Sequence, residues 1–151
     1  MNIDISSLEQ LAKVTNCIAG YLNTCTSSQL IFLQGDLGAG KTTFVQYLLK
    51  DLGVAVHIPS PSYALLNTYD LEKGTAVHAD FYRLESEEDL DLIGWDVAIE
   101  NADIILVEWP EKALSQDPDI ALVFDIDEEK RTLTLPHHST LNHLIDQLKQ
   151  L

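Results

Sequence analysis

Apolar residues recur at the spacing of an α-helix in three parts of the chain. The first part extends to about Leu22, and its apolar positions are Leu8, Leu11, Ala12, Ile18, Ala19 and Leu22. The second runs from Lys41 to Leu52 and is followed by Gly53, a residue that commonly ends helices. The third lies in the tail, 138–151, with an apolar stripe at Leu141, Leu144, Ile145 and Leu148. We expect a helix in each part.

Two polar patterns indicate where helices begin. Ser6-Ser7-Leu8-Glu9 matches a capping box, in which the side chains of Ser6 and Glu9 accept hydrogen bonds from each other's backbone N–H groups. The acidic stretch Glu85–Asp91 places negative charge where the N-terminus of a helix is stabilised by it. We therefore expect helices to begin at these two places.

Short apolar runs lie between the helical stretches. Gln29–Leu33 and Asp103–Glu108 are nearly continuous in apolar residues, which is typical of strands buried on both faces. Tyr63–Tyr69 and Thr75–Asp80 flank a turn at Glu72-Lys73-Gly74, which predicts a hairpin.

A second hairpin is predicted near the end of the chain. Ile120–Ile126 and Arg131–Leu135 read as its strands, and Asp127-Glu128-Glu129-Lys130 as its turn. Strands and helices thus alternate along the chain, and this alternation predicts an α/β fold. No repeat, low-complexity segment or Pro/Gly linker divides the sequence, so residues 1–151 are expected to form a single domain.

The segment Gly35-Asp36-Leu37-Gly38-Ala39-Gly40-Lys41-Thr42 matches the phosphate-binding pattern G-x-x-x-x-G-K-[ST], the Walker A motif. It follows a predicted strand and opens a predicted helix, as the pattern requires. The bland alternative is a glycine-rich turn that happens to contain Lys and Thr. Nucleotide binding explains the pattern better and makes the fold a three-layer P-loop NTPase-like domain, with a central, mostly parallel sheet plus hairpins.

Each position of this loop has an expected role toward a nucleotide. Gly38, Ala39 and Gly40 would turn backbone N–H groups toward phosphate oxygens. Lys41 would place a charge at the β- and γ-phosphates, and the Thr42 hydroxyl would be a ligand of Mg²⁺. Thr43 is expected to reach the α-phosphate.

A magnesium–nucleotide site also needs a carboxylate at the end of a neighbouring apolar strand. Glu108 ends one predicted strand and Asp80 ends another. We assign Glu108 to Mg²⁺, directly or through water, and Asp80 to water activation or to the outer coordination shell of the metal. The division of roles between these two residues stays open.

Three other residues allow two interpretations each. His78 precedes Asp80 by two positions and points the same way along the strand, either as a buried structural histidine or as a proton carrier. Trp109 is either a core residue at a strand end or a ring in contact with the nucleotide or a partner. Ser62, in Ser60-Pro61-Ser62-Tyr63, belongs either to a switch that senses the γ-phosphate or to a simple strand entry.

The net charge of the chain argues against direct binding to nucleic acid or to membranes. Nine Lys and Arg stand against 24 Asp and Glu, a formal net charge of −15, and such a surface repels nucleic-acid backbones and anionic lipid. We expect no strong direct binding to nucleic acid and no membrane association. No basic and apolar leader stands at the N-terminus and no apolar run approaches the roughly 20 residues of a membrane span, so cytoplasm is the expected compartment. Cys17 and Cys25 are read as free thiols in preference to a disulfide that closes a small loop.

ATP is favoured over GTP. None of the seven lysines stands in an Asn/Thr-Lys-x-Asp box, the element with which Ras-type GTPases read guanine. The chain has only two arginines, Arg83 and Arg131, too few for the substrate clamps of small-molecule kinases. Slow intrinsic hydrolysis that a partner accelerates is therefore expected.

Four segments together carry a family resemblance. They are 35–43 (Gly-Asp-Leu-Gly-Ala-Gly-Lys-Thr-Thr), 60–63 (Ser-Pro-Ser-Tyr), 78–84 (His-Ala-Asp-Phe-Tyr-Arg-Leu) and 107–111 (Val-Glu-Trp-Pro-Glu). In this order they resemble the bacterial TsaE (YjeE) family. The resemblance implies a cytoplasmic Mg²⁺-dependent P-loop ATPase that works with TsaB and TsaD. That complex adds threonylcarbamoyl to adenosine 37 of tRNAs that read codons starting with A.

The resemblance also implies roles for individual residues. Lys41 would bind phosphate, and Thr42 and Glu108 would belong to the metal site. Asp80 would be needed for hydrolysis, and Trp109 would be functional. We expect Lys41, Asp80 and Glu108 to be the catalytic residues. The nucleotide base would lie between the N-terminal segment, at Glu9–Leu11, and the late hairpin, at Arg131–Thr132. One departure is Ser62, where the family usually has threonine; the hydroxyl survives without the β-branch that restricts its rotamers.

Three functions remain in competition at this point. The first is a Mg²⁺-ATPase subunit of the tRNA-modifying complex. The second is a nucleotide-dependent scaffold with negligible turnover, and the third is a stand-alone small-molecule phosphotransferase. Phosphate release with and without the partner proteins would separate them.

Overall fold

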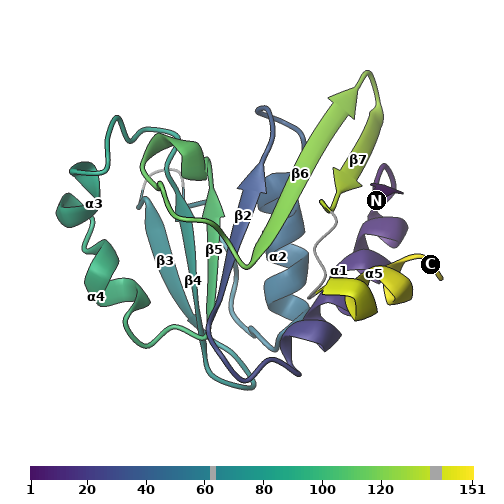
Figure 1. The fold of residues 1–151 in the computed structure, drawn as a ribbon, viewed down its shortest axis with the longest axis horizontal. Helices are drawn as coiled ribbons and strands as arrows, with labels where there is room; N and C mark the ends of the chain where they lie inside the picture. The colour runs from purple at the N-terminus through teal and green to yellow at the C-terminus, as the bar shows by residue number, and fades with distance from the viewer. Residues whose placement is uncertain (62–63, 137–140) are drawn as a thin grey trace.

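Seven strands form a single mixed sheet in the computed structural model, which describes residues 1–61, 64–136 and 141–151. The strands lie in the order β1-β7-β6-β2-β5-β4-β3, and Figure 1 labels all of them except β1. Their bounds are β1 Asn2–Asp4, β2 Gln29–Gln34, β3 Leu66–Asp70, β4 Thr75–Asp80, β5 Ile104–Glu108, β6 Ile120–Asp127 and β7 Lys130–Thr134. The helices are α1 Leu8–Leu22, α2 Lys41–Asp51, α3 Asp89–Leu92, α4 Trp95–Ile99 and α5 Asn142–Leu148, with a short 3₁₀ turn, η1, at Pro110–Lys112.

The centre of the sheet is parallel and its edges are antiparallel. β6, β2, β5 and β4 run side by side in one direction. β3 pairs with β4, β7 with β6, and β1 with β7 in the antiparallel sense. The α/β class is confirmed, and the sheet is mixed: both predicted hairpins join it, each through one strand of the parallel centre, β4 or β6.

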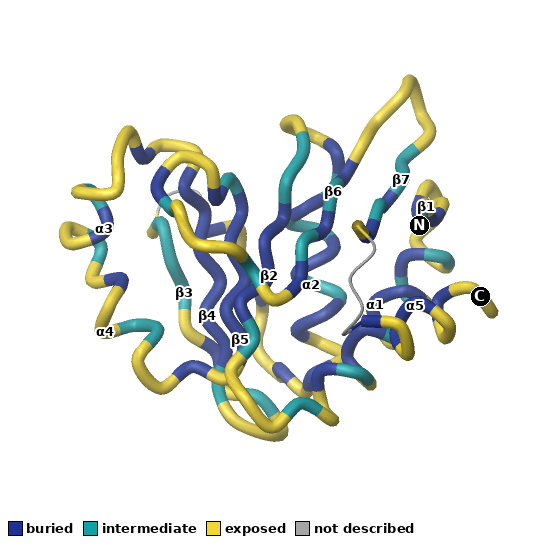
Figure 2. The backbone as a smooth tube through the Cα atoms, viewed as in Figure 1, coloured by how far each residue is buried: buried dark blue, intermediate teal, exposed yellow. Residues whose placement is uncertain are grey.

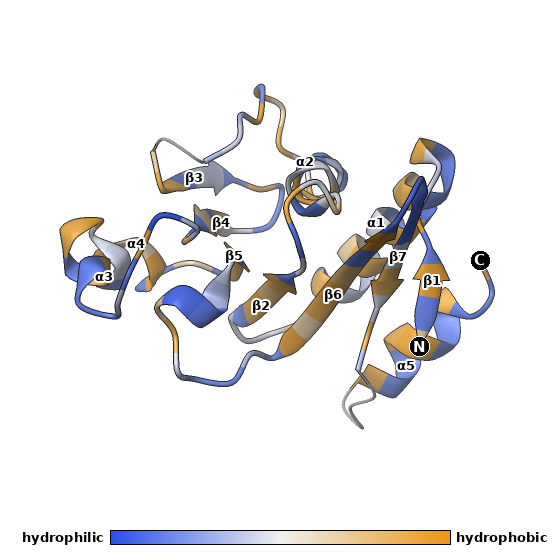
Figure 3. Cartoon of the chain, turned by 90° about the horizontal axis from the view of Figure 1, so that it is seen from above, coloured by the Kyte–Doolittle hydropathy of each residue, from blue (hydrophilic) through white to orange (hydrophobic). Residues whose placement is uncertain are grey.

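Helices cover both faces of this sheet. One apolar cluster joins Ile31 and Leu33 of β2 to α1, α2 and α5, and a second joins Leu30 and Phe32 to the segment that contains α3 and α4. Figure 3 shows α2 on one side of the central strands and α3 and α4 on the other. Both faces of β2 are therefore buried, which explains its continuous apolar sequence, and Figure 2 shows the central strands as buried.

The start of α1 differs from the expected capping box. Ser7, not Ser6, caps the helix, because its hydroxyl accepts a hydrogen bond from the backbone N–H of Gln10 at 3.1 Å. The Ser6 hydroxyl instead accepts from the backbone N–H of Arg131 at 2.9 Å. Glu9 pairs with Lys13 on the next turn at 2.9 Å. A contact between distant segments thus displaces the local pairing of Ser6 with Glu9.

Some of the remaining elements follow the sequence pattern with small shifts, and others were not expected. β3 begins at Leu66, and Tyr63, the expected start, lies outside the described residues. The acidic stretch forms only the four-residue helix α3, while β1 and α4 were not expected from the sequence. Leu144, Ile145 and Leu148 are buried on α5, as the predicted stripe requires.

Two further expectations concern cysteines and membranes. Cys17 and Cys25 are free in the part of the chain that the structure describes. Among these described residues, no helix has both the length and the apolar character needed to cross a bilayer.

Candidate functional site

A cavity of about 340 Å³ opens where the parallel strands β2, β4 and β5 end. The loop between β2 and α2 forms its floor, the segment before α1 forms one wall, and the ends of β4 and β5 form another. Its lining residues are Ile5, Ser6, Leu8, Leu11, Asp36, Leu37, Gly38, Gly40, Lys41, Thr42, Thr43, Asp80, Glu108, Trp109 and Arg131. The carboxyl ends of parallel strands are where α/β sheets usually bind ligands.

The loop 35–40 owes its shape to glycine. Gly40 has φ +105° and stands directly before α2, so the chain enters the helix from the left-handed region. Gly35 has φ +139°, and a Cβ atom there would meet the backbone carbonyl of Phe124 on β6. The loop therefore packs against the neighbouring strand with no room for a side chain, and the first turn of α2 faces the cavity.

Lys41 is buried at the floor of the cavity, with 4% of its surface exposed. Its ammonium donates hydrogen bonds to the carbonyl of Gly35 and, at 3.0 Å, to that of Asp36. The ammonium also lies 4.4 Å from the ring centroid of Trp109. Burial lowers the pKa of Lys41, while the charges of Glu108 and then Asp80 oppose this shift. A cation is thus held among backbone carbonyls and carboxylates at the cavity floor.

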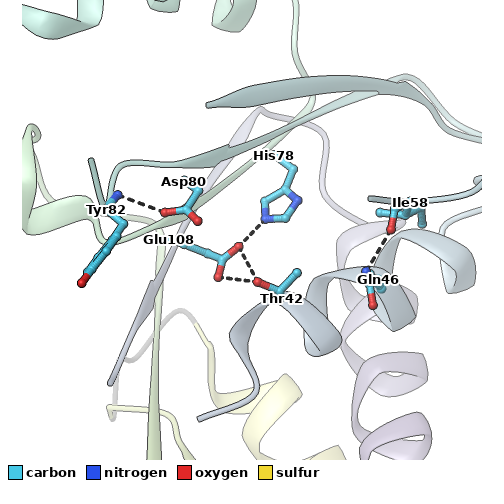
Figure 4. A network of polar contacts seen from close by, with 7 residues as sticks. All are labelled: Thr42, Gln46, Ile58, His78, Asp80, Tyr82 and Glu108. Atoms are coloured by element: carbon cyan, nitrogen blue, oxygen red, sulfur yellow. Dashed lines mark hydrogen bonds and ion pairs between the residues drawn. The ribbon is translucent and has the colours of Figure 1, made fainter. Parts of the chain in front are cut away.

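Thr42, the residue after Lys41 on α2, is in contact with Glu108 at the end of β5. The Thr42 hydroxyl lies 2.9 Å from one carboxylate oxygen of Glu108 and 3.1 Å from the other (Figure 4). His78 approaches the same carboxylate from β4, with Nε2 at 2.7 Å from Oε2. Glu108 and His78 are both buried. The expected nearness of Thr42 and Glu108 is present in the structure.

Asp80 stands beside this group. It is the register partner of Glu108 on the adjacent parallel strand, and it is 8% exposed. One of its carboxylate oxygens accepts a hydrogen bond from the backbone N–H of Tyr82 at 3.0 Å (Figure 4). Two carboxylates and one hydroxyl therefore converge at one end of the cavity.

This oxygen-rich corner suits a hard divalent cation such as Mg²⁺. Within the described ranges of the chain, no group of three or more His, Cys, Asp or Glu could hold a metal without help. Mg²⁺ characteristically binds to one or two protein groups and completes its shell with water and phosphate oxygens. Thr42, Glu108 and Asp80 thus fit a metal that arrives with a nucleotide, and do not form a closed protein cage.

Trp109 lies between the apolar core and the cavity. It is half-buried, packs against the second apolar cluster and also lines the cavity. Its backbone adopts φ +56°, and its ring lies 5.1 Å from that of Tyr82. The ring therefore stands between the apolar core and the ammonium of Lys41.

The other end of the cavity is apolar. Leu11, an expected residue, lines it, and so do Ile5, Leu8 and Leu37, which the sequence analysis did not identify. The alternation Asn2-Ile3-Asp4-Ile5 was a signal that could have predicted Ile5. Alternating polar and apolar residues are typical of a strand with one buried face, and Ile5 is the last apolar residue of this pattern. Leu8 and Leu37 are exposed on the rim.

The late hairpin contributes through Arg131. Its Nε donates to the carbonyl of Gly38 at 3.4 Å, and its backbone holds Ser6. Thr132 and Ala39 are not among the described residues that line the cavity. Ser62 lies outside the described residues. Of the expected base contacts, the structure thus brings Leu11 and Arg131 to the cavity and leaves Thr132 away from it.

Comparisons with known proteins complete the description. Residues 5–134 match the family model described as "Threonylcarbamoyl adenosine biosynthesis protein TsaE". Relatives described as tRNA threonylcarbamoyladenosine biosynthesis protein TsaE include one from Rickettsia felis, 35% identical over 96% of this chain and 85% of the relative. Another, from Nostoc, is 32% identical over 96% of this chain and 98% of its own length. A third, from Aquifex aeolicus, is 37% identical over 87% and 92%.

A solved structure has a similar fold. The crystal structure of YdiB from Bacillus subtilis superposes with a TM-score of 0.68 over 99% of this chain and 94% of that one. The identity between the two sequences is 22%, so the likeness concerns the arrangement of strands and helices.

Proposed function

The chain belongs to the TsaE family of tRNA threonylcarbamoyladenosine biosynthesis proteins, and on this premise we propose that it is the Mg²⁺-dependent ATPase of that pathway. It would bind and hydrolyse ATP as a subunit that acts with TsaB and TsaD on adenosine 37 of tRNAs that read codons starting with A. We further propose that residues 1–151 form one P-loop NTPase-like domain that works in the cytoplasm.

One observation carries this proposal. Thr42, at the start of α2, and Glu108, at the end of β5, are 66 positions apart in sequence and in hydrogen-bond contact in space. In P-loop NTPases, Mg²⁺ is held by a hydroxyl next to the Walker A lysine and by a carboxylate at the end of a neighbouring strand. A chance glycine-rich turn would not bring a strand-end carboxylate to this hydroxyl.

The Walker A loop and the start of α2 would bind the phosphates and the metal. The backbone N–H groups of 38–40 and the first turn of α2 would bind the phosphates, and the positive end of the helix favours their charge. Lys41 would contact the β- and γ-phosphates, and Thr43 the α-phosphate. Thr42 and Glu108 would hold Mg²⁺, which would supply positive charge to the phosphates.

Asp80 has the position for orienting a water molecule. It stands at the same end of the sheet as Glu108, and the Tyr82 N–H fixes one of its oxygens. The Asp80 carboxylate would accept a proton from water near the γ-phosphate. The apolar wall of Leu11, Ile5 and Leu8 would receive the adenine base, and the Trp109 ring would shield the phosphate end from solvent.

Phosphate release from ATP tests the proposed function. The protein alone is expected to hydrolyse ATP slowly, and addition of the TsaB–TsaD pair is expected to raise the rate, because no arginine beyond Arg131 lines the described cavity. Binding without turnover in either condition would favour a scaffold instead. Transfer of the γ-phosphate to a small acceptor by the protein alone would favour a phosphotransferase.

A further inference from the structure

His78 is a buried histidine whose role the proposed chemistry leaves open. It lies on β4, its side chain is fully shielded from solvent, and its Nε2 atom lies 2.7 Å from Oε2 of Glu108 (Figure 4). A histidine deep in a sheet is costly unless its polar atoms are bound. Its position two residues before Asp80 keeps it on the face that carries the site.

The Glu108 carboxylate determines which ring nitrogen of His78 carries a proton. An ionised carboxylate only accepts, so the Thr42 hydroxyl donates to it and the Nε2–H of His78 donates to Oε2. In the neutral form of the ring, the imidazole is then the tautomer with its proton on Nε2, and Nδ1 is left as an acceptor. Among the described residues, Nδ1 is buried and has no hydrogen-bond partner.

The neighbouring strand offers a complementary donor. Asn67 of β3 is the register partner of His78 on β4, so the two side chains share one face of the sheet. The Nδ2 atom of Asn67, a donor, is also buried and also has no partner in the described part of the chain. Donor and acceptor thus stand on register-paired residues of adjacent strands, and the Tyr69 hydroxyl of β3 is a second group that interacts with Asn67.

We propose that His78 is a positioning residue that fixes the Glu108 carboxylate in the orientation in which it faces Thr42, and that Asn67 favours the required tautomer from the next strand. This inference rests on the proposed function for the meaning of that orientation, which is Mg²⁺ binding. A ligand that is held by an outer hydrogen bond binds its metal more tightly, because less rotational freedom is lost. His78 touches neither nucleotide nor metal and acts through Glu108.

Two replacements separate a hydrogen bond from simple packing. Glutamine places its side-chain amide nitrogen near the position of histidine Nε2 and keeps a donor for Glu108, whereas leucine fills similar space without one. The measurement is the Mg²⁺ concentration that half-saturates ADP binding, followed by calorimetry, with binding in excess EDTA as reference. We expect His78→Leu to raise this concentration about tenfold or more, with little change in ADP affinity without metal. His78→Gln should restore most of the loss.

Val77 provides a control on the same strand. Val77→Ala removes buried volume from the other face of the same strand and should lower the melting temperature without changing the Mg²⁺ dependence. An unchanged Mg²⁺ dependence in His78→Leu, or an equal loss in His78→Gln, would overturn the proposal and leave His78 as a packing residue.

A measurement on the unaltered protein covers the case in which the variants do not fold. Long-range ¹⁵N–¹H spectra of the histidine rings report which nitrogen carries the proton. The His78 ring should show the proton on Nε2, and a ring with the proton on Nδ1 would contradict the proposal. This readout needs no nucleotide, so a protein that binds no ADP would remove the proposed function while the His78–Glu108 hydrogen bond was still tested.

Discussion

Asp80 and Glu108 are register partners at the ends of two adjacent parallel strands, so two buried carboxylates stand next to each other at the edge of one cavity. Their surroundings differ. Glu108 is bound by Thr42 and His78, whereas an oxygen of Asp80 is held by the backbone of Tyr82. We therefore expect that removal of each carboxylate has a different consequence.

Asp80→Ala should stop hydrolysis and preserve nucleotide binding, because it removes a proton acceptor and leaves Lys41 and Thr42, the expected ligands of phosphate and Mg²⁺, in the chain. The rate of phosphate release should fall about 100-fold or more, as is typical when a general base is lost. Phosphate release and ADP calorimetry measure the two effects, and Asp91→Ala, on the exposed surface of α3, is the matched control. Normal hydrolysis by Asp80→Ala with the partners present would refute this role.

Glu108→Gln should raise the Mg²⁺ requirement for nucleotide binding. The amide retains the size of the side chain and loses the charge that attracts the metal, so half-saturation should need about tenfold more Mg²⁺. A magnesium titration at fixed ADP measures the shift, and Glu111→Gln, exposed on η1, provides the comparison. If the two titrations coincide with that of the parent protein, Glu108 is not part of the metal site.

Lys41→Ala should weaken ATP binding by about ten- to hundredfold, since a charged hydrogen-bond donor contributes about 1.5–3 kcal/mol. Calorimetry with ATP and ADP measures the loss, which should be greater for the triphosphate. Lys50→Ala, an exposed lysine at the other end of α2, is the control for a general change in charge. Equal affinities of Lys41→Ala and Lys50→Ala for ATP would contradict the assignment.

ATP affinity should fall as the pH rises toward the ordinary pKa of lysine, about 10.4. Burial lowers the pKa of Lys41 in the free protein, whereas bound phosphates would raise it. Between these two pKa values ATP binding takes up a proton, so a higher pH opposes binding. Calorimetry in two buffers of different ionisation enthalpy detects this uptake, and Lys41→Ala should abolish it. Proton release in place of uptake would show that ATP binding lowers the pKa of Lys41, which contradicts the prediction.

Gly35→Ala should destabilise the fold as well as the loop. The new methyl group would meet the carbonyl of Phe124, and φ +139° is strained for any residue with a Cβ atom. We expect a loss of about 2 kcal/mol or more, which lowers the melting temperature by about 5 °C. Gly20→Ala, in open space within α1, should instead raise it slightly. A Gly35→Ala protein as stable as its parent would show that β6 yields at this contact.

Local patterns predicted several of the residues that line the cavity. The Walker A loop is contiguous in sequence, and Asp80 and Glu108 were identified because each ends an apolar strand, whose position in a parallel sheet determines where its last side chain lies. What the sequence left open was the partner of each group. The contact between His78 and Glu108 depends on which strands are neighbours, and strand order is not a local property.

The distant wall of the cavity was harder to predict. Ile5 and Leu8 reach it because β1 pairs with β7 and Arg131 holds Ser6, 125 positions away. The same contact explains why the capping box failed, since the Ser6 hydroxyl is used by the hairpin. Helix α4 was missed because five residues after Gly94 are too few for a clear helical period.

The two tryptophans occupy contrasting places. Trp109 lies 4.4 Å from the ammonium of Lys41 and lines the cavity, whereas Trp95 is buried against Phe81 in the second apolar cluster, with ring centroids 5.1 Å apart. The chain thus contains two indole chromophores in separate environments, one beside the ligand cavity and one in the interior. Fluorescence of a Trp95→Phe protein would follow ligand entry, and that of a Trp109→Phe protein would follow unfolding, without any attached dye.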